Sequence, residues 1–151
     1  MSAGSKLFLT KSQIRQIEQE GQAAYPNECC GAILGADITG TDGIQRIVKR
    51  LEPLKNSFSQ GEQYHRFSLD PAELMRLEKQ SSEWKLTVQG FYHSHPDHPA
   101  RPSEYDRQYA WPYYSYVIVS IMNRKPADMT SWLLDETTEQ FGEQPISTES
   151  R

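Results

Sequence analysis

The residues from His93 to Asp106, HSHPDHPARPSEYD, combine two imidazoles, a hydroxyl and a carboxylate at a spacing that suits one metal ion. Alternate side chains of an extended strand point to the same face, so His93 and His95 can reach the same cation. Asp106 lies eleven positions after His95, beyond a loop with three prolines. Because proline fixes φ, this loop is a stiff, non-helical return path. These features predict a metal-dependent hydrolase in which His93, His95 and Asp106 bind the metal.

The predicted ligand set leaves one coordination position for water, as in catalytic zinc sites with three protein ligands. The water must lose a proton and the leaving amine must gain one, and a carboxylate that is not a ligand usually does both. Glu28 is the candidate for this general acid/base. It stands just before the apolar stretch CCGAILG, where packing alone does not explain a charged group.

Ser103 has two possible roles that the sequence does not separate. A hydroxyl followed three residues later by the carboxylate of Asp106 matches a capping box, although Glu is the better partner at that position. A hydroxyl at a helix start also lies at the positive end of the dipole, where it can stabilise a developing oxyanion. Capping and catalysis are compatible, and both are retained for Ser103.

The remaining histidines and the cysteines have simpler interpretations. A His-x-His pair can lie on a solvated strand face, but here the surrounding motif favours a metal site. The spacing requires neither His65 nor His98 as a ligand. Cys29 and Cys30 are adjacent, which is poor geometry for a disulfide, and we expect reduced, buried thiols rather than soft metal ligands or a nucleophile. The aromatic residues between 109 and 116 are predicted to be core and rim packing.

The composition excludes several classes of protein. At 151 residues the chain fits one domain with a core that needs neither disulfides nor a structural metal. A net charge of -4 and the lack of a long basic run argue against a nucleic-acid partner. The apolar runs are short and the N-terminus MSAGSKLFLTKSQ has no signal core, so we expect a cytoplasmic protein without a membrane partner.

The hydrophobic pattern predicts a mixed α and β protein in which strands outnumber helices. Helices are expected at 11–24 after the N-cap Thr10, from Asp70-Pro71 onward with Leu74, Leu77 and Ser81 inward, and at 103–110. Strands are expected at 29–35, 44–54 after a turn at 40–43, 65–69, 86–95, 115–122 and 129–135. We therefore predict one domain over 1–135, followed by a frayed polar tail over 136–151.

The candidate residues together resemble a known signature. The pattern resembles the JAMM motif of the MPN-plus metalloprotease family, which has a Glu upstream, then H-[ST]-H-P, six residues, Ser, two residues and Asp. No motif position of this sequence departs from it. The resemblance spans residues 7–135. It implies that Glu28 is the general acid/base, that His93, His95 and Asp106 are the ligands, and that Ser103 stabilises the tetrahedral intermediate.

The resemblance also implies a fold and a substrate class. The fold would be a curved β-sheet flanked by helices, similar to that of cytidine deaminases, with one zinc ion per chain. The activity would be hydrolysis of a peptide or isopeptide bond. This compact chain looks like the small stand-alone prokaryotic members, whose partners are ubiquitin-like or sulfur-carrier proteins cleaved after a C-terminal Gly-Gly. The oligomeric state is not predicted.

Three other functions compete with this hypothesis. The first is a non-catalytic MPN scaffold that binds a partner and keeps zinc for structure, against which the complete motif argues. The second is a zinc deaminase, which needs H-x-E and P-C-x-x-C patterns that the ECCG segment lacks. The third is a cupin-like His-x-His iron oxygenase, for which a Ser-x-x-Asp helix start is the wrong ligand arrangement.

Overall fold

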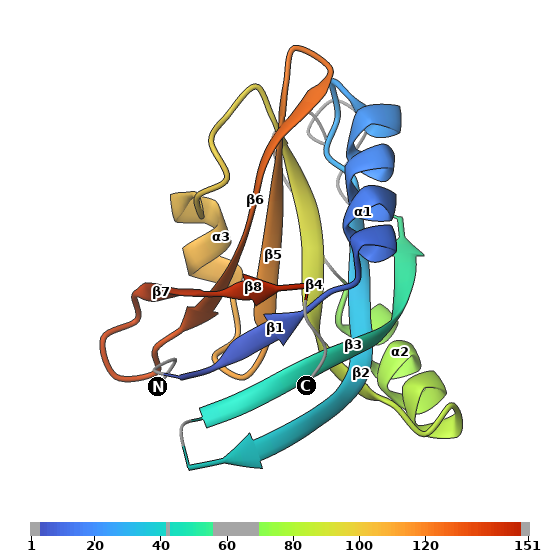
Figure 1. Cartoon of the computed structure of the whole chain (residues 1–151), viewed down its shortest axis with the longest axis vertical. Coiled ribbons are helices and arrows are strands. Elements are labelled where there is room, and N and C mark those ends of the chain that lie inside the picture. Colours follow the sequence, from blue (N-terminus) through green and yellow to red (C-terminus); the bar gives the residue numbers. More distant parts are fainter. Residues whose placement is uncertain (1–3, 42, 56–69, 149–151) are drawn as a thin grey trace.

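The computed structural model describes residues 4–41, 43–55 and 70–148 and contains a curved eight-stranded sheet with three helices packed against it (Figure 1). The sheet order is β7-β6-β5-β4-β2-β3-β1-β8. The strands are β1 (Lys6–Phe8), β2 (Cys30–Gly40), β3 (Gly43–Leu54), β4 (Thr87–Pro96), β5 (Ser115–Met122), β6 (Lys125–Leu134), β7 (Phe141–Gln144) and β8 (Ile146–Ser147). The predicted mixed α and β fold with a curved sheet is confirmed.

The three helices are α1 (Lys11–Ala24), α2 (Pro71–Glu83) and α3 (Glu104–Tyr109), and each begins at its predicted cap. The Thr10 side chain accepts a hydrogen bond from the N–H of Gln13 at the start of α1. Asp70 caps α2 before Pro71, the position that tolerates proline best. In the described part of the chain, no helix combines the length and apolar character needed to cross a membrane.

The central strand β4 separates two layers of core. Tyr92 packs on the α1 side with Leu7, Ile17, Ile33 and Val117, and Phe91 packs on the α2 side with Ala32, Leu34, Leu77 and Val88. Because side chains alternate along a strand, His93 and His95 lie on the same side as Phe91. The two histidines are therefore presented on the face that α2 covers.

The β2–β3 hairpin is longer than the apolar pattern predicts. Strand 29–35 was predicted from its buried apolar residues, whereas β2 continues to Gly40 through positions that are only partly buried or exposed. The predicted turn is present, with Gly40 paired to Gly43. The predicted strand 65–69 lies outside the described residues.

The C-terminal segment corrects the sequence prediction. Residues 136–151 were expected to be frayed, but β7 pairs with β6 and β8 pairs with β1, at the two opposite edges of the sheet (Figure 1). The N–H of Leu7 donates to Pro145 O at 2.9 Å, and the Ser131 hydroxyl donates to the buried Gln144 amide at 2.8 Å. Backbone hydrogen bonds and one buried amide anchor the segment, so its low apolar content was a misleading signal.

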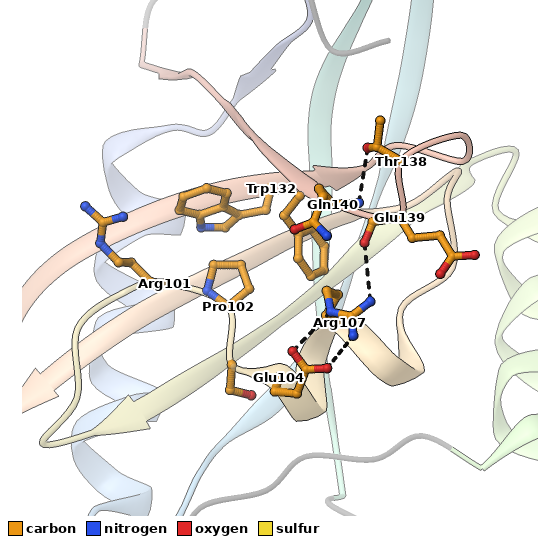
Figure 2. Close-up of a pocket in the computed structure, with 10 residues that line it drawn as sticks. Arg101, Pro102, Glu104, Arg107, Trp132, Thr138, Glu139 and Gln140 are labelled. Atoms are coloured by element: carbon orange, nitrogen blue, oxygen red, sulfur yellow. Dashed lines mark hydrogen bonds and ion pairs between the residues drawn. The ribbon is translucent and has the colours of Figure 1, made fainter.

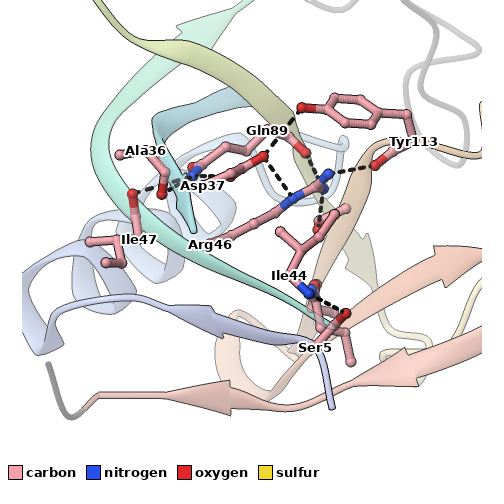
Figure 3. Close-up of polar contacts among 11 residues, drawn as sticks. Ser5, Ala36, Asp37, Ile44, Arg46, Ile47, Gln89 and Tyr113 are labelled. Atoms are coloured by element: carbon pink, nitrogen blue, oxygen red, sulfur yellow. Dashed lines mark hydrogen bonds and ion pairs between the residues drawn. The ribbon is translucent and has the colours of Figure 1, made fainter. Parts of the chain in front are cut away.

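A buried arginine links β3, β4 and the start of β5 (Figure 3). Arg46 is 1% exposed and donates to Gln89 O at 2.7 Å, to the Ser115 hydroxyl at 2.8 Å and to Tyr113 O at 2.7 Å. Its Nε lies 3.5 Å from the Asp37 carboxylate. A buried charge is tolerated only when it is paired and hydrogen-bonded in this way. This network is structural and includes none of the candidate site residues.

Removing residues 136–151 should destabilise the protein strongly. The truncation exposes the backbone edges of β6 and β1 and removes Gln144, the hydrogen-bond partner of the buried Ser131 hydroxyl. We expect a loss of several kcal/mol, which lowers the melting temperature by about 10 °C or more for a chain of this size. Thermal unfolding followed by circular dichroism measures the shift. Removal of 149–151 alone is the control. Equal melting temperatures for the 1–135 and full-length chains would restore the prediction of a dispensable tail.

Candidate metal centre

Strand β4 and helix α3 bring the three predicted ligands together. His93 Nε2 lies 3.2 Å from His95 Nε2 and 3.4 Å from Asp106 Oδ1, and His95 Nε2 lies 3.2 Å from Asp106 Oδ2. One ligand atom from each residue falls within 4.8 Å of the other two. His93 and His95 are 2% and 7% exposed, so the alternative of two histidines on a solvated face is wrong.

These spacings fit a tetrahedral metal ion. Zinc binds imidazole nitrogen and carboxylate oxygen at about 2.0–2.2 Å. Two ligands of a tetrahedron with such bonds lie about 3.3–3.6 Å apart, which is close to the 3.2 Å between the two imidazole nitrogens and to the 3.2–3.4 Å from each imidazole to one of the two Asp106 oxygens. Two neutral imidazoles and one carboxylate are also a usual set of three protein ligands in catalytic zinc sites. The residues present can therefore hold one divalent ion.

The proline loop fixes the orientation of His95. Its Nδ1 lies 2.9 Å from the carbonyl oxygen of Pro99, which can only accept, so the Nδ1 N–H donates to this carbonyl and Nε2 is the ring nitrogen that faces His93 and Asp106. Side chains of β5 and β6 hold this loop, since Ser120 donates to the His98 carbonyl and Thr130 donates to the Ala100 carbonyl, each at 2.6 Å. The sequence indicated a stiff loop but gave no signal for these anchors.

Helix α3 positions Asp106 through a capping box. The Ser103 hydroxyl accepts the Asp106 N–H at 3.0 Å, and Asp106 Oδ2 accepts the Ser103 N–H at 2.9 Å. The same Oδ2 faces His95. The capping role of Ser103 is thus present, and it orients the carboxylate toward the two imidazoles. Its hydroxyl proton has no acceptor in the described part of the chain, so it remains available to a ligand.

Replacing Ser103 should therefore affect both stability and the chemistry of the site. Ser103→Ala loses an N-cap, which costs about 1 kcal/mol, and removes the hydroxyl donor, for which we expect a fall in kcat of about 10²-fold. Ser103→Thr keeps both the cap and a hydroxyl and serves as the matched variant. Urea unfolding and steady-state kinetics measure the two effects. A catalytic role would be excluded if the alanine variant lost only stability.

Glu28 lies beside the ligands because β2 pairs with β4 at this point. Cys30 is in register with His93, and the Cys29 N–H donates to the Ser94 hydroxyl at 2.8 Å, with the Ser94 N–H returning a bond to Cys29 O. Ser94, between the two histidines, therefore anchors the residue that follows Glu28. Sequence reasoning missed this role, although the small hydroxyl residue of the H-[ST]-H pattern was its signal.

The Glu28 carboxyl is buried and has an unusual pKa. It is 7% exposed, and its Oε1 has no hydrogen-bond partner among the described residues. Burial raises its pKa from 4.5 to about 7, while the charge of His93 acts to lower it and that of Asp106 to raise it. A carboxyl that exchanges its proton near neutral pH, next to a metal site, suits a general acid/base.

Asp106 and His93 shift the pKa values of one another, and each favours the charged form of the other. Burial alone would raise the pKa of Asp106, but the charge of His93 and hydrogen bonds from both imidazoles hold that pKa well below its usual range. Burial alone would lower the pKa of His93, but the charge and hydrogen bond of Asp106, with a further contribution from Glu28, raise it. The site therefore holds Asp106 ionised and competes for positive charge, either a proton or a metal ion.

In metal-free protein, Glu28 should make stability depend on pH. Because its folded-state pKa is raised from 4.5 to about 7, the folded state is favoured by protonation of Glu28 at low pH and loses this advantage as pH rises through about 7. Relative to Glu28→Gln, the wild type should become less stable between pH 5 and pH 8 by about 3 kcal/mol. Urea unfolding of both proteins in a chelator at the two pH values measures it, and parallel curves would contradict the buried carboxyl.

The other candidate residues fall outside the ligand set. Cys29 and Cys30 are free; Cys30 is buried as expected, whereas Cys29 is only partly buried, and burial raises the pKa of Cys29 to about 12 and also raises that of Cys30. His98 is exposed, and His65 lies outside the described residues. Tyr113 packs over Arg46, as predicted for rim packing.

Two cavities adjoin helix α3. One, of about 420 Å³, includes His93 and Asp106 in its lining. The other, of about 520 Å³, includes Ser103, Arg101 and Trp132 (Figure 2). In the second cavity, Arg107 is paired with Glu104 and also donates to Glu139 O (Figure 2). The candidate metal centre thus borders an aromatic cavity, while Ser103 lines a polar one.

Comparison with known proteins identifies the family. The model of the family described as prokaryotic homologs of the JAB domain matches residues 10–135, the range that carries Glu28, the two histidines, Ser103 and Asp106. The chain belongs to this family. A curated relative, the desampylase of Haloferax volcanii, is 34% identical over 131 residues, which cover 85% of this chain and 87% of that protein.

Two solved structures are similar to this JAB-family chain. The solution structure of a protein from Desulfitobacterium hafniense has a TM-score of 0.76 and 32% identity, with 97% of this chain and 94% of that chain covered. The solution structure of a protein from Salinibacter ruber has a TM-score of 0.66 and 34% identity, with 93% and 89% covered. Both matches cover a larger share of the chain than the family match over residues 10–135.

Proposed function

We propose that this JAB-family chain is a zinc metallopeptidase that hydrolyses a peptide or isopeptide bond after the C-terminal Gly-Gly of a ubiquitin-like or sulfur-carrier protein. The single observation that carries the proposal is the convergence of His93, His95 and Asp106, with one ligand atom of each within 4.8 Å of the others and Glu28 buried beside them. The raised pKa of this carboxyl supports a catalytic site over a structural one, because strongly shifted pKa values concentrate at functional sites.

The positions of the residues support the following roles in this proposal. A zinc ion held by His93, His95 and Asp106 would supply Lewis acidity and bring the pKa of water to about 7. Glu28 accepts the proton of the attacking water and returns it to the leaving amine. The Ser103 hydroxyl donates a hydrogen bond to the oxyanion of the tetrahedral intermediate. Pro99 O and the Ser103 N–H hold His95 and Asp106 in place.

The family and its relative support the substrate class. The relative at 34% identity is named desampylase, which denotes removal of a SAMP, a ubiquitin-like modifier. A Gly-Gly tail is narrow and extended, so its last carbonyl can approach a buried metal that a bulkier chain could not reach. We therefore propose a class of bond and not one substrate. The bond cleaved is an amide between the terminal glycine and an amine, and the amine is the group released.

A cleavage assay tests the proposal. Zinc-loaded protein is incubated with a ubiquitin-like carrier that bears a short peptide after Gly-Gly, and the products are identified by mass. We expect one cut after the second glycine, which disappears with a chelator and returns on addition of zinc. A Gly-Ala carrier is the matched control. Stoichiometric zinc without cleavage of any Gly-Gly carrier would favour the non-catalytic scaffold instead.

A further inference from the structure

The cavity that borders the metal centre is aromatic. Its lining residues are Phe91, His93, Tyr105, Asp106, Tyr109 and Trp111, together with Pro71, Gln108, Ala110 and Tyr116. Two of them are ligand residues, so whatever occupies the cavity lies next to the reacting atoms. At about 420 Å³ it falls within the range of roughly 300–1,000 Å³ that ligand pockets occupy.

One polar group of the walls is already hydrogen-bonded within the protein. The Tyr116 hydroxyl accepts the Trp111 N–H at 2.8 Å, which leaves its ring as the cavity wall. The Tyr105 and Tyr109 rings stack with centroids 4.5 Å apart. Among the described residues that line the cavity, Asp106 and His93 alone carry a side chain that is charged or that ordinarily titrates near neutral pH. Such walls favour an apolar or aromatic group over a charged one.

The walls are held open by contacts with neighbouring elements. The loop after α3 is tied to α2, since the Tyr114 hydroxyl donates to Glu78 Oε2 at 2.6 Å. The Trp111 ring packs on Tyr114 with centroids 5.9 Å apart. Because both ends of the loop are anchored, the cavity is present before any ligand binds, and binding costs little ordering of the protein.

The apolar surface continues from the cavity to the outside. Tyr109 is 65% exposed, and Met75, one helical turn after Pro71 on the same face of α2, is 73% exposed. An exposed apolar rim around a pocket is typical of a binding site for a polypeptide. The second cavity lacks this character, since it is lined by Arg107, Glu104 and Glu139 (Figure 2).

We propose that the aromatic cavity is a specificity pocket that binds one large apolar side chain of the polypeptide substrate, close to the bond that is cleaved. This inference rests on the proposed function and extends it. Two glycines carry no side chain to fill such a cavity, so its occupant is the residue before the Gly-Gly or the first residue after the bond. The proposal is for a single side chain, so a preference is expected at one of these two positions.

The test compares substrates that differ at these two positions. Gly-Gly carrier fusions carry Phe, Leu, Ser or Gly either before the glycines or after the bond, and kcat/KM is measured with the zinc-loaded full chain. We expect Phe or Leu to exceed Gly by about 10-fold or more at one of the positions only. Equal kcat/KM for all four residues at both positions would overturn the pocket.

Variants of the lining decide whether the cavity causes the preference. Ala110→Phe fills the cavity and Tyr109→Ala removes part of its wall, and each should reduce the preference to about 3-fold or less. Tyr113→Ala, an exposed aromatic residue in the same loop that does not line this cavity, is the matched control and should keep the preference. A preference unchanged in both lining variants would contradict the proposal.

A binding measurement separates this inference from the proposed function. Fluorescein-labelled peptides with the same substitutions are titrated with zinc-loaded Glu28→Gln protein, and anisotropy gives Kd. If the wild type cleaves no Gly-Gly fusion, the proposed function fails. The pocket is still supported in that case if the Phe peptide binds with a 10-fold lower Kd than the Gly peptide and Ala110→Phe abolishes this difference. If cleavage occurs but no peptide is preferred in binding, the pocket is overturned and the proposed function stands.

Discussion

Glu28→Gln protein should bind zinc with the same stoichiometry as the wild type and hydrolyse a Gly-Gly substrate about 10²- to 10⁴-fold more slowly. The side chain keeps its size and buried position, but it can no longer accept and return a proton. Because Glu28 is not among the ligands that converge on the metal position, the metal should stay bound. Zinc content by mass spectrometry and kcat from initial rates measure the two quantities.

The control for this variant is Glu143→Gln, which removes an exposed carboxylate on β7 and should leave kcat unchanged. Circular dichroism of both variants checks the fold. If Glu28→Gln retained wild-type kcat, a different group would move the proton. If it lost zinc instead, Glu28 would be a ligand, and the three-residue set would be incomplete.

His93→Ala and Asp106→Ala should instead lose the metal before any other property. Each removes one of three ligand atoms, so we expect zinc affinity to fall by at least about 100-fold. Activity should fall with zinc occupancy. Zinc should also raise the melting temperature of the wild type but not of these variants, because only a ligand that binds the folded state stabilises it. Competition with a chromogenic chelator and thermal unfolding measure both effects.

His98→Ala is the matched control for the ligand variants. His98 lies three residues after His95, but it is exposed, and its backbone carbonyl rather than its ring is held by Ser120. Its removal should leave zinc affinity and melting temperature unchanged. Comparable zinc loss in His98→Ala and His93→Ala would mean that the metal lies elsewhere in the proline loop.

Local sequence signals predicted the elements that position the site. Thr10, Asp70 and Ser103 begin the three helices because a side-chain oxygen can accept the otherwise unpaired N–H groups of the first turn. The alternation of His93 and His95 with Ser94 predicted a shared face, and the structure brings their rings together. These features depend on neighbours in the sequence, so the residue types at the helix starts and the alternation along the strand are enough to predict them.

Long-range contacts were less accessible from the sequence. The Ser120 and Thr130 hydroxyls hold carbonyls of the proline loop, and nothing in their local sequence marks them as anchors. The role of Ile146 also depends on β1 at the other end of the chain, while Gln144 bonds Ser131 on the preceding strand β6. A polar segment that pairs mainly through its backbone has no hydrophobic pattern, and this explains why the predicted frayed tail was wrong.

The raised pKa of Glu28 also required the structure. The sequence identified a carboxyl beside an apolar strand, but its pKa near 7 comes from burial and from the combined charges of His93 and Asp106. These groups meet only after β2 pairs with β4 and α3 folds back over the strand.

Anomalous diffraction at the zinc edge, recorded from crystals of the zinc-loaded full chain, tests the account most directly. We expect one strong anomalous peak per chain, at about 2.0–2.2 Å from a nitrogen of His93, a nitrogen of His95 and an oxygen of Asp106, with the Glu28 carboxyl nearby but outside bonding distance. A zinc ion bound to other residues, or one that takes Glu28 as a ligand in place of Asp106, would contradict it.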